Sequence, residues 1–197
     1  MAITRAKTSS IAQGPTTKKS LAADNPIILP GSYESIATVT VGSTPASEIL
    51  FTSIPQTYTH LQIRALVRNS RAATASNTYF RFNGDTGNNY AIHVLTGTGA
   101  SATAGASTGI NIMLAQDPSA NFTANCFAGQ IYDVLDYTNT NKYKTVRILQ
   151  GYDGNGSGEV QLWSGVWMGT NAVSSIRFFP NSGNYVQYTE FALYGIK

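Results

Sequence analysis

The sequence contains few of the residues that form disulfides and metal centres. It has one cysteine, Cys126, and two histidines, His60 and His93. A single cysteine excludes an intramolecular disulfide and a cysteine-based metal cluster. The two histidines do not have the spacing of a zinc-binding pair. We therefore expect no metal and no cofactor, and we expect Cys126 to be an inert, buried thiol within a strand.

Long hydrophobic runs are also missing. No stretch approaches the length of a transmembrane helix, and the N-terminus lacks the apolar core of a secretory signal peptide. We therefore expect a protein that is made in the cytoplasm, is not exported by a Sec-type signal and does not enter a membrane.

Charged residues make up only 12% of the chain, about half the usual share of a soluble domain. Such a surface is either covered by polar uncharged side chains, as on secreted proteins and virions, or partly buried against other subunits. The net charge of +3 belongs to residues 1–31, which leaves nine of the 13 basic and nine of the 10 acidic residues for 32–197. Because the surplus of positive charge is confined to this segment, whose cations lack interleaved aromatic residues, we do not expect nucleic-acid binding.

Residues 1–31 differ from the rest of the chain in pattern as well as charge. They are rich in Ser, Thr, Ala and Lys, are interrupted by Pro15, Pro26 and Pro30, and show no sustained apolar period. Such a segment cannot bury enough apolar surface to fold alone. We predict an extended anchoring arm over 1–31, followed by one domain over 32–197. The candidate partner-binding residues of the arm are its cations and its apolar triplet: Arg5, Lys7, Lys18, Lys19, Ile27, Ile28 and Leu29.

From residue 33 onward the pattern is that of strands. Residues 57–68 alternate most clearly, with Leu61, Ile63, Ala65 and Val67 on one face. About ten or eleven short strands, separated by Gly, Pro and Asn turns, predict an all-β antiparallel sandwich. A jelly roll is the first choice and an immunoglobulin-like sandwich the second. Residues 97–109 (GTGASATAGASTG) are low in complexity and are expected to form a flexible loop.

Motifs for catalysis are missing from the sequence. There is no G-x-S-x-G elbow, no phosphate-binding glycine loop and no carboxylate pair on one face of a strand. Residues 153–164 resemble a calcium loop, but the twelfth position is Ser164 instead of a glutamate, so a plain hairpin turn is favoured. We therefore expect that the protein is not an enzyme.

Two groups of residues are candidates for surface contacts. Arginine is favoured at protein interfaces, and five arginines are expected to face outward from strands: Arg64, Arg68, Arg81, Arg147 and Arg177. Alternatively, these arginines form cross-strand pairs and protect sheet edges. Tryptophan can stack on sugars, so Trp163 and Trp167 are candidates for a glycan site, unless they fill the core.

Several segments resemble small virion proteins of tailed bacteriophages, especially those of aquatic and cyanobacterial hosts. They are residues 1–14 (MAITRAKTSSIAQG), 33–42 (YESIATVTVG), 51–64 (FTSIPQTYTHLQIR), 81–86 (RFNGDT) and 192–197 (ALYGIK). The resemblance implies a structural role in a virion and no catalytic residue. We expect a capsid decoration, or cement, protein, homotrimeric, that binds the major coat protein or other virion subunits through its arm and stabilises the shell. The alternative is a tail or head fibre component that binds a host surface polysaccharide.

Overall fold

The structure is a computed structural model that describes residues 31–197. The predicted arm and its seven candidate partner-binding residues lie outside this range, apart from Gly31. The described residues form twelve strands and no helix, so the prediction of an all-β fold is confirmed. They contain no helix long and apolar enough to span a membrane.

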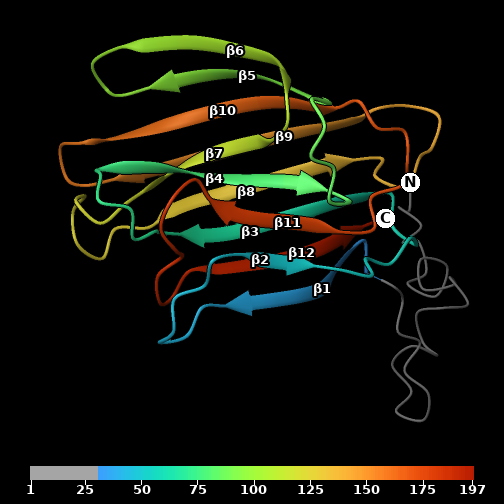
Figure 1. Ribbon diagram of the computed structural model, residues 1–197, viewed down its shortest axis with the longest axis horizontal. Helices are drawn as coiled ribbons and strands as arrows, with labels where there is room; N and C mark the ends of the chain where they lie inside the picture. The colour runs from blue at the N-terminus through green and yellow to red at the C-terminus, as the bar shows by residue number, and fades with distance from the viewer. Residues whose placement is uncertain (1–30) are drawn as a thin grey trace, which may run out of the picture. The chain divides into compact units, whose positions relative to one another are not determined.

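The strands follow one another with short connections (Figure 1). They are β1 (Tyr33–Thr40), β2 (Ile49–Phe51), β3 (His60–Val67), β4 (Ala75–Phe82), β5 (Tyr90–Gly97), β6 (Ala102–Ile110), β7 (Met113–Pro118), β8 (Ala128–Leu135), β9 (Lys144–Asp153), β10 (Gly158–Trp167), β11 (Ile176–Pro180) and β12 (Glu190–Ile196).

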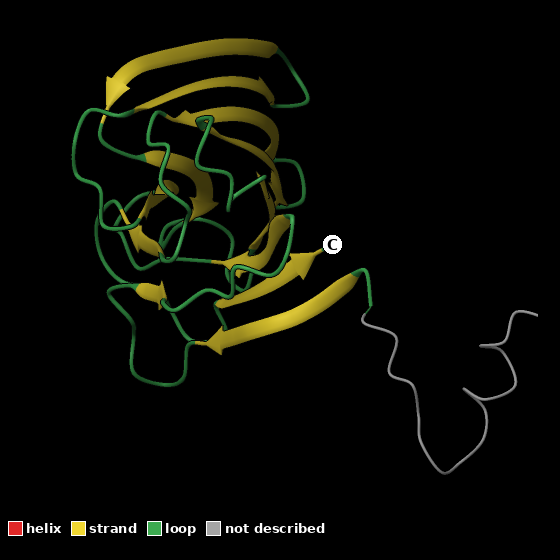
Figure 2. Ribbon diagram, turned by 90° about the vertical axis from the view of Figure 1, so that its right-hand side faces the viewer, coloured by secondary structure: helices red, strands yellow, loops and turns green. Residues whose placement is uncertain are grey.

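The strands form two antiparallel sheets, one of eight strands in the order β1-β12-β3-β8-β9-β10-β5-β6 and one of four in the order β2-β11-β4-β7. The four strands β1-β12-β3-β8 and the four strands β2-β11-β4-β7 have the order of a jelly roll, in which the chain alternates between the two sheets. The hairpins β5–β6 and β9–β10 are inserted into this pattern and widen the larger sheet at one end (Figures 1 and 2). The predicted jelly-roll sandwich is therefore confirmed, with two added hairpins.

The core lies between the sheets and is rich in aromatic rings. Phe80 on β4 packs edge-to-face on Tyr132 of β8 at 5.3 Å between ring centroids, and Phe178 on β11 lies 4.7 Å from Phe191 of β12. All four side chains are buried. The core face predicted for residues 57–68 is confirmed, because the apolar side chains of β3 point inward into the same cluster. The outward side chains of the eight-stranded sheet are therefore left for contacts outside the domain.

Two predictions about local structure are wrong. Residues 102–109, expected to lie within a flexible loop, belong to strand β6, because a turn in which the Thr98 N–H donates a hydrogen bond to the Ser101 carbonyl brings them alongside β5. Cys126 lies in the loop before β8 and is only partly buried. Its thiol donates to the Asp153 carbonyl at 3.2 Å.

Candidate functional site: the outer face of the eight-stranded sheet

The register of the large sheet places apolar side chains in one row across its outer face. Ile131 of β8 lies opposite Leu149 of β9, which lies opposite Leu162 of β10, which lies opposite Leu95 of β5. The three leucines are 52%, 53% and 54% exposed, respectively. We call these four residues the apolar row. Large apolar side chains scattered singly on a surface need no explanation, but a contiguous group of them marks an interaction site.

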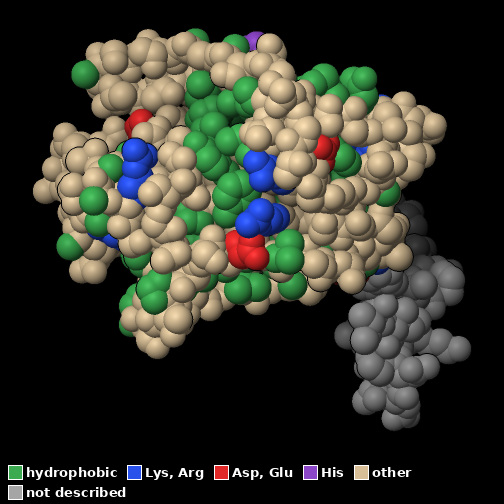
Figure 3. Space-filling view, in the orientation of Figure 1, with side chains coloured by type: hydrophobic (Ala, Val, Ile, Leu, Met, Phe, Trp, Pro, Cys, Tyr) green, Lys and Arg blue, Asp and Glu red, His purple; other side chains and the backbone are tan. Residues whose placement is uncertain are grey.

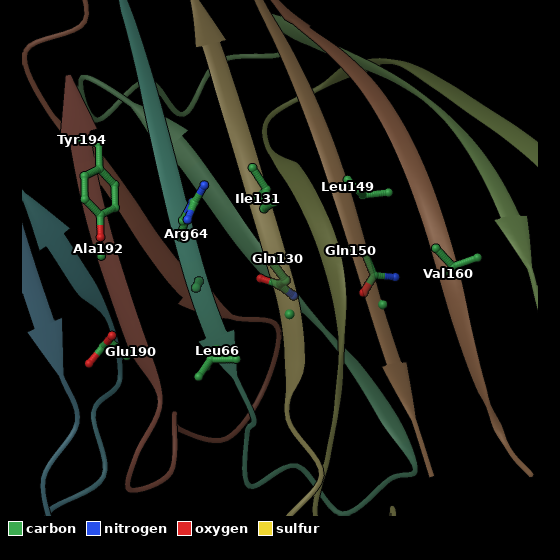
Figure 4. A pocket seen from close by; sticks show the side chains of 13 residues that line it. Arg64, Leu66, Gln130, Ile131, Leu149, Gln150, Val160, Glu190, Ala192 and Tyr194 are labelled. Carbon is green, nitrogen blue, oxygen red and sulfur yellow. The ribbon is translucent and has the colours of Figure 1, made fainter. Parts of the chain in front are cut away.

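A hollow lies beside the apolar row. In the neighbouring row of the register, Gly129 of β8 and Gly151 of β9 lie between Leu66 of β3 and Val160 of β10. The two glycines have no side chain to fill the space, while Leu66 and Val160 stand at either side, each 54% exposed (Figure 4). The result is an open hollow of about 690 Å³. We call it the glycine hollow.

Gly129 keeps the hollow open by its small size, while its backbone conformation does not require glycine. It has no positive φ, and a Cβ atom added to it would meet no atom within 4 Å. A larger residue would therefore fit the backbone and would occupy the hollow. Pockets of this kind accept an apolar anchor side chain from a binding partner.

Charged side chains surround the apolar row with both signs in equal number: Arg64, Asp133, Arg147 and Glu190. Among residues 31–197, none of these four forms an ion pair within 4.0 Å. Asp133 and Arg147 are neighbours in the register, and the Asp133 carboxylate accepts a hydrogen bond from Gln62 at 2.8 Å. The outer face is thus neutral overall, with charges available to a partner.

Two tyrosines form the end of this face near β1. The Tyr33 ring stacks on Tyr194 of β12 at 4.7 Å, and the Arg64 guanidinium lies 5.7 Å from the Tyr33 ring centroid. The Tyr33 hydroxyl donates to the Gln62 side chain at 2.8 Å. Partial burial raises the pKa of the Tyr33 hydroxyl above its ordinary value. These contacts fix the polar margin of the apolar row in place.

The face therefore has the composition of a protein interface: an apolar centre, a hollow, and a polar margin with two arginines that pair with no carboxylate of residues 31–197. Within the described part of the chain, no group of three or more His, Cys, Asp or Glu residues could hold a metal ion. The calcium-like loop is a hairpin turn between β9 and β10, in which the Asp153 carboxylate accepts a hydrogen bond from the Asn155 N–H at 2.7 Å.

The five candidate arginines do not form one surface. Arg64 and Arg147 lie on the outer face of the large sheet, as predicted. Arg81 and Arg177 belong to the four-stranded sheet, where their guanidinium groups lie 5.1 and 4.7 Å from the Phe179 ring and Arg177 pairs with Glu48. The ion pair between Arg177 and Glu48 agrees with the alternative interpretation, in which the arginines form pairs within the domain. Figure 3 shows how few charged side chains lie on one face of the molecule.

The prediction that Arg68 faces outward is wrong. Its side chain is buried and donates hydrogen bonds to the carbonyl oxygens of Thr123 and Cys126 at 2.8 Å and of Phe122 at 3.1 Å. Strand β3 ends at Val67, so the alternation of faces does not extend to Arg68. The guanidinium instead holds the loop that precedes β8.

The prediction that Trp163 and Trp167 stack on a glycan is also wrong. They are 6% and 3% exposed and point inward from β10. The Trp163 ring N–H donates to the Gln161 side chain at 2.9 Å, and that of Trp167 donates to Asp85 at 2.7 Å. Both indoles are core residues with satisfied donors.

The sequence interpretation did not identify the apolar row. The sequence of β10 does contain a pattern that could have indicated it. The outward residues Val160 and Leu162 are apolar, and they alternate with inward residues that include Trp163. A strand that is apolar on both faces is typical of burial on both faces. One of these faces has no cover within the described residues, because the four-stranded sheet packs on the other.

Comparisons of the chain with models of protein families, with curated proteins and with solved structures found no match.

Proposed function

We propose that this chain is a structural protein of a virion, a decoration protein that binds the coat shell and stabilises it. The observation that carries the proposal is the apolar row, which crosses four neighbouring strands beside the glycine hollow and is covered by none of the described residues. Exposing these side chains to water is unfavourable, and covering them against another subunit recovers that free energy.

Three further features support a role in assembly. The body is a jelly roll, a fold used by many viral shell proteins. Residues 32–197 carry no net charge, so the body does not repel neighbouring copies on a crowded shell. The sequence segments named above resemble virion proteins of tailed bacteriophages.

The proposal gives the arm and the body separate tasks. The arm of residues 1–31 binds neighbouring coat subunits, and its cations complement an acidic shell surface and speed encounter. Thirty-one extended residues reach roughly 100 Å, which is enough to cross a neighbouring subunit. The outer face of the large sheet then rests on the subunit to which the arm brings it.

Binding to capsids that lack this protein tests the proposal. The full chain should sediment with such capsids and raise the temperature at which they disrupt. Deleting residues 1–31 should leave a folded β domain, judged by circular dichroism, that no longer sediments with them. A full chain that fails to bind capsids contradicts the proposal, and full binding after the deletion contradicts the role given to the arm.

The alternative, a fibre component that binds host polysaccharide, has lost its two proposed stacking residues, because Trp163 and Trp167 are buried. The centre of the outer face is formed by leucine, isoleucine and valine, which lack the flat ring that stacks on a sugar, and the two tyrosine rings at its margin, Tyr33 and Tyr194, stack on each other. We therefore favour the decoration protein. Binding of the full chain to a glycan array would favour the fibre component instead.

A further inference from the structure

Each sheet of the sandwich has two edge strands, and three of these four edges are protected against pairing with another strand. Strand β1 has an irregular register between Ser35 and Ala37. Strand β2 has only three residues, and the six-residue β7 ends in Asp117 and Pro118. Bulges, short length, charge and proline are the usual devices by which natural proteins prevent sheets from joining edge to edge.

Strand β6 is the fourth edge and has none of these devices along most of its length. It has nine residues, ATAGASTGI, without charge or proline, and eight of them are exposed. Its pairing with β5 is regular from Ala102 to Thr108, and the only irregularity lies beyond Thr108. It forms the outer end of the eight-stranded sheet, where no strand of residues 31–197 pairs with one row of its backbone N–H and C=O groups (Figure 2).

We propose that β6 pairs with β6 of a second copy of this chain, antiparallel and across a two-fold axis at Gly105. The eight-stranded sheets of two copies then join into one. This inference does not depend on the proposed function, because it concerns an edge of the sheet and not its outer face.

The sequence of β6 is complementary to itself in this register. Ala104 lies opposite Ala106 of the second copy, and Thr103 lies opposite its Ser107, a type of pair that forms cross-strand hydrogen bonds. At the axis Gly105 meets its own copy. No like charges oppose one another. A two-fold contact of this kind uses the same surface on both subunits and closes at two.

The surroundings of β6 favour a whole second copy as the partner. Consecutive residues of a strand point to opposite faces, and both sets are exposed in β6, so nothing in its own domain obstructs a neighbouring sheet. Leu95, at the end of the apolar row, lies opposite Ala104. Joining two copies at β6 therefore places two apolar rows in one wider surface.

A disulfide at the axis tests the register directly. Residues opposite one another in an antiparallel pair have Cα atoms about 4.5–5.5 Å apart, within the range that a disulfide bridges. The variant Gly105→Cys, made in the full chain with Cys126→Ser, should form a cross-linked dimer under mild oxidation. A Cβ at Gly105 has its nearest neighbour at 3.4 Å, on Val94, so the cysteine fits. The matched control, Thr38→Cys on β1, should not cross-link.

Charge substitutions provide the second test, with the mass in solution measured by light scattering. The unmodified chain should have twice the mass of one chain. Ala104→Lys with Ala106→Lys should give monomers, because two pairs of lysines then face one another. Ala104→Lys with Ala106→Glu should restore the dimer, because each lysine then faces a glutamate.

Several outcomes would overturn the proposal. They are a monomeric unmodified chain, a dimer that survives the double lysine variant, and a mass of three chains, which would support the trimer expected from the sequence. A monomer whose double lysine variant loses only capsid binding would show that β6 pairs with a strand of another protein.

Discussion

Replacing two leucines of the apolar row by threonine should weaken binding to the shell without unfolding the protein. Leu149 and Leu162 are neighbours in the register, and both are about half exposed. Threonine has a high strand propensity, so the backbone of β9 and β10 should be unaffected. The atoms removed lie at the solvent-exposed ends of the side chains.

The size of the effect follows from the exposed fractions. Full burial of a leucine side chain is worth roughly 1.5–3 kcal/mol, and about half of each side chain is already buried in the domain. A partner that covers the remainder therefore gains about 1 kcal/mol from each leucine. The double substitution should weaken binding by about 2 kcal/mol, or roughly 30-fold. The free energy of unfolding should fall by about 1 kcal/mol or less.

Co-sedimentation with capsids that lack the protein, over a range of concentrations, measures this change. The matched control is Leu50→Thr on β2, a leucine of similar exposure, 49%, on the other sheet. The control should bind as the unmodified chain does. An unchanged affinity for Leu149→Thr with Leu162→Thr would refute the assignment of the outer face as the binding surface.

Three further substitutions test other parts of the structure. Gly129→Leu should fill the glycine hollow and weaken capsid binding. In urea unfolding the variant should be at least as stable as the unmodified chain, because a Cβ atom at position 129 meets no other atom. Unchanged binding would mean that the hollow receives no side chain of a partner. Arg68→Met should remove three hydrogen bonds, two of them to carbonyl groups with no other donor among the described residues, and lower the free energy of unfolding by about 2–4 kcal/mol; a loss below about 0.5 kcal/mol would contradict its role. Burial raises the pKa of Asp117 to about 7, so the folded protein retains a proton that the unfolded chain releases. The free energy of unfolding should therefore fall as the pH rises from about 4 to about 7, and this dependence on pH should disappear in Asp117→Asn. An equal dependence in both proteins would contradict the raised pKa of Asp117.

The parts of the fold that follow from local pattern could be predicted from the sequence. The alternation of residues 57–68 gives the inward face of β3 correctly, because one face of that strand is apolar and buried. Strand β6 could not be predicted in this way. Its alanines and glycines have low strand propensity, and it is held by pairing with β5.

The candidate site depends on information that no single segment contains. The apolar row exists because Ile131, Leu149, Leu162 and Leu95 share one row of the register. Strands β8, β9 and β10 follow one another along the chain, but β5, which carries Leu95, is distant from its neighbour β10 in the sequence. In the same way, the place of Arg68 depends on a loop more than fifty residues later, whose carbonyl groups it binds at sequence separations of 54, 55 and 58. Contacts of this type follow from the order of the strands in the two sheets, and the alternation pattern of a single strand does not reveal that order.

The claim that this chain is a shell component of a virion is tested most directly by its abundance in purified particles. Quantitative mass spectrometry should compare it with the major coat protein of the same particles. The decoration role predicts an amount of the same order as the coat protein. Absence from purified particles, or a trace amount that follows the tail proteins, would contradict it.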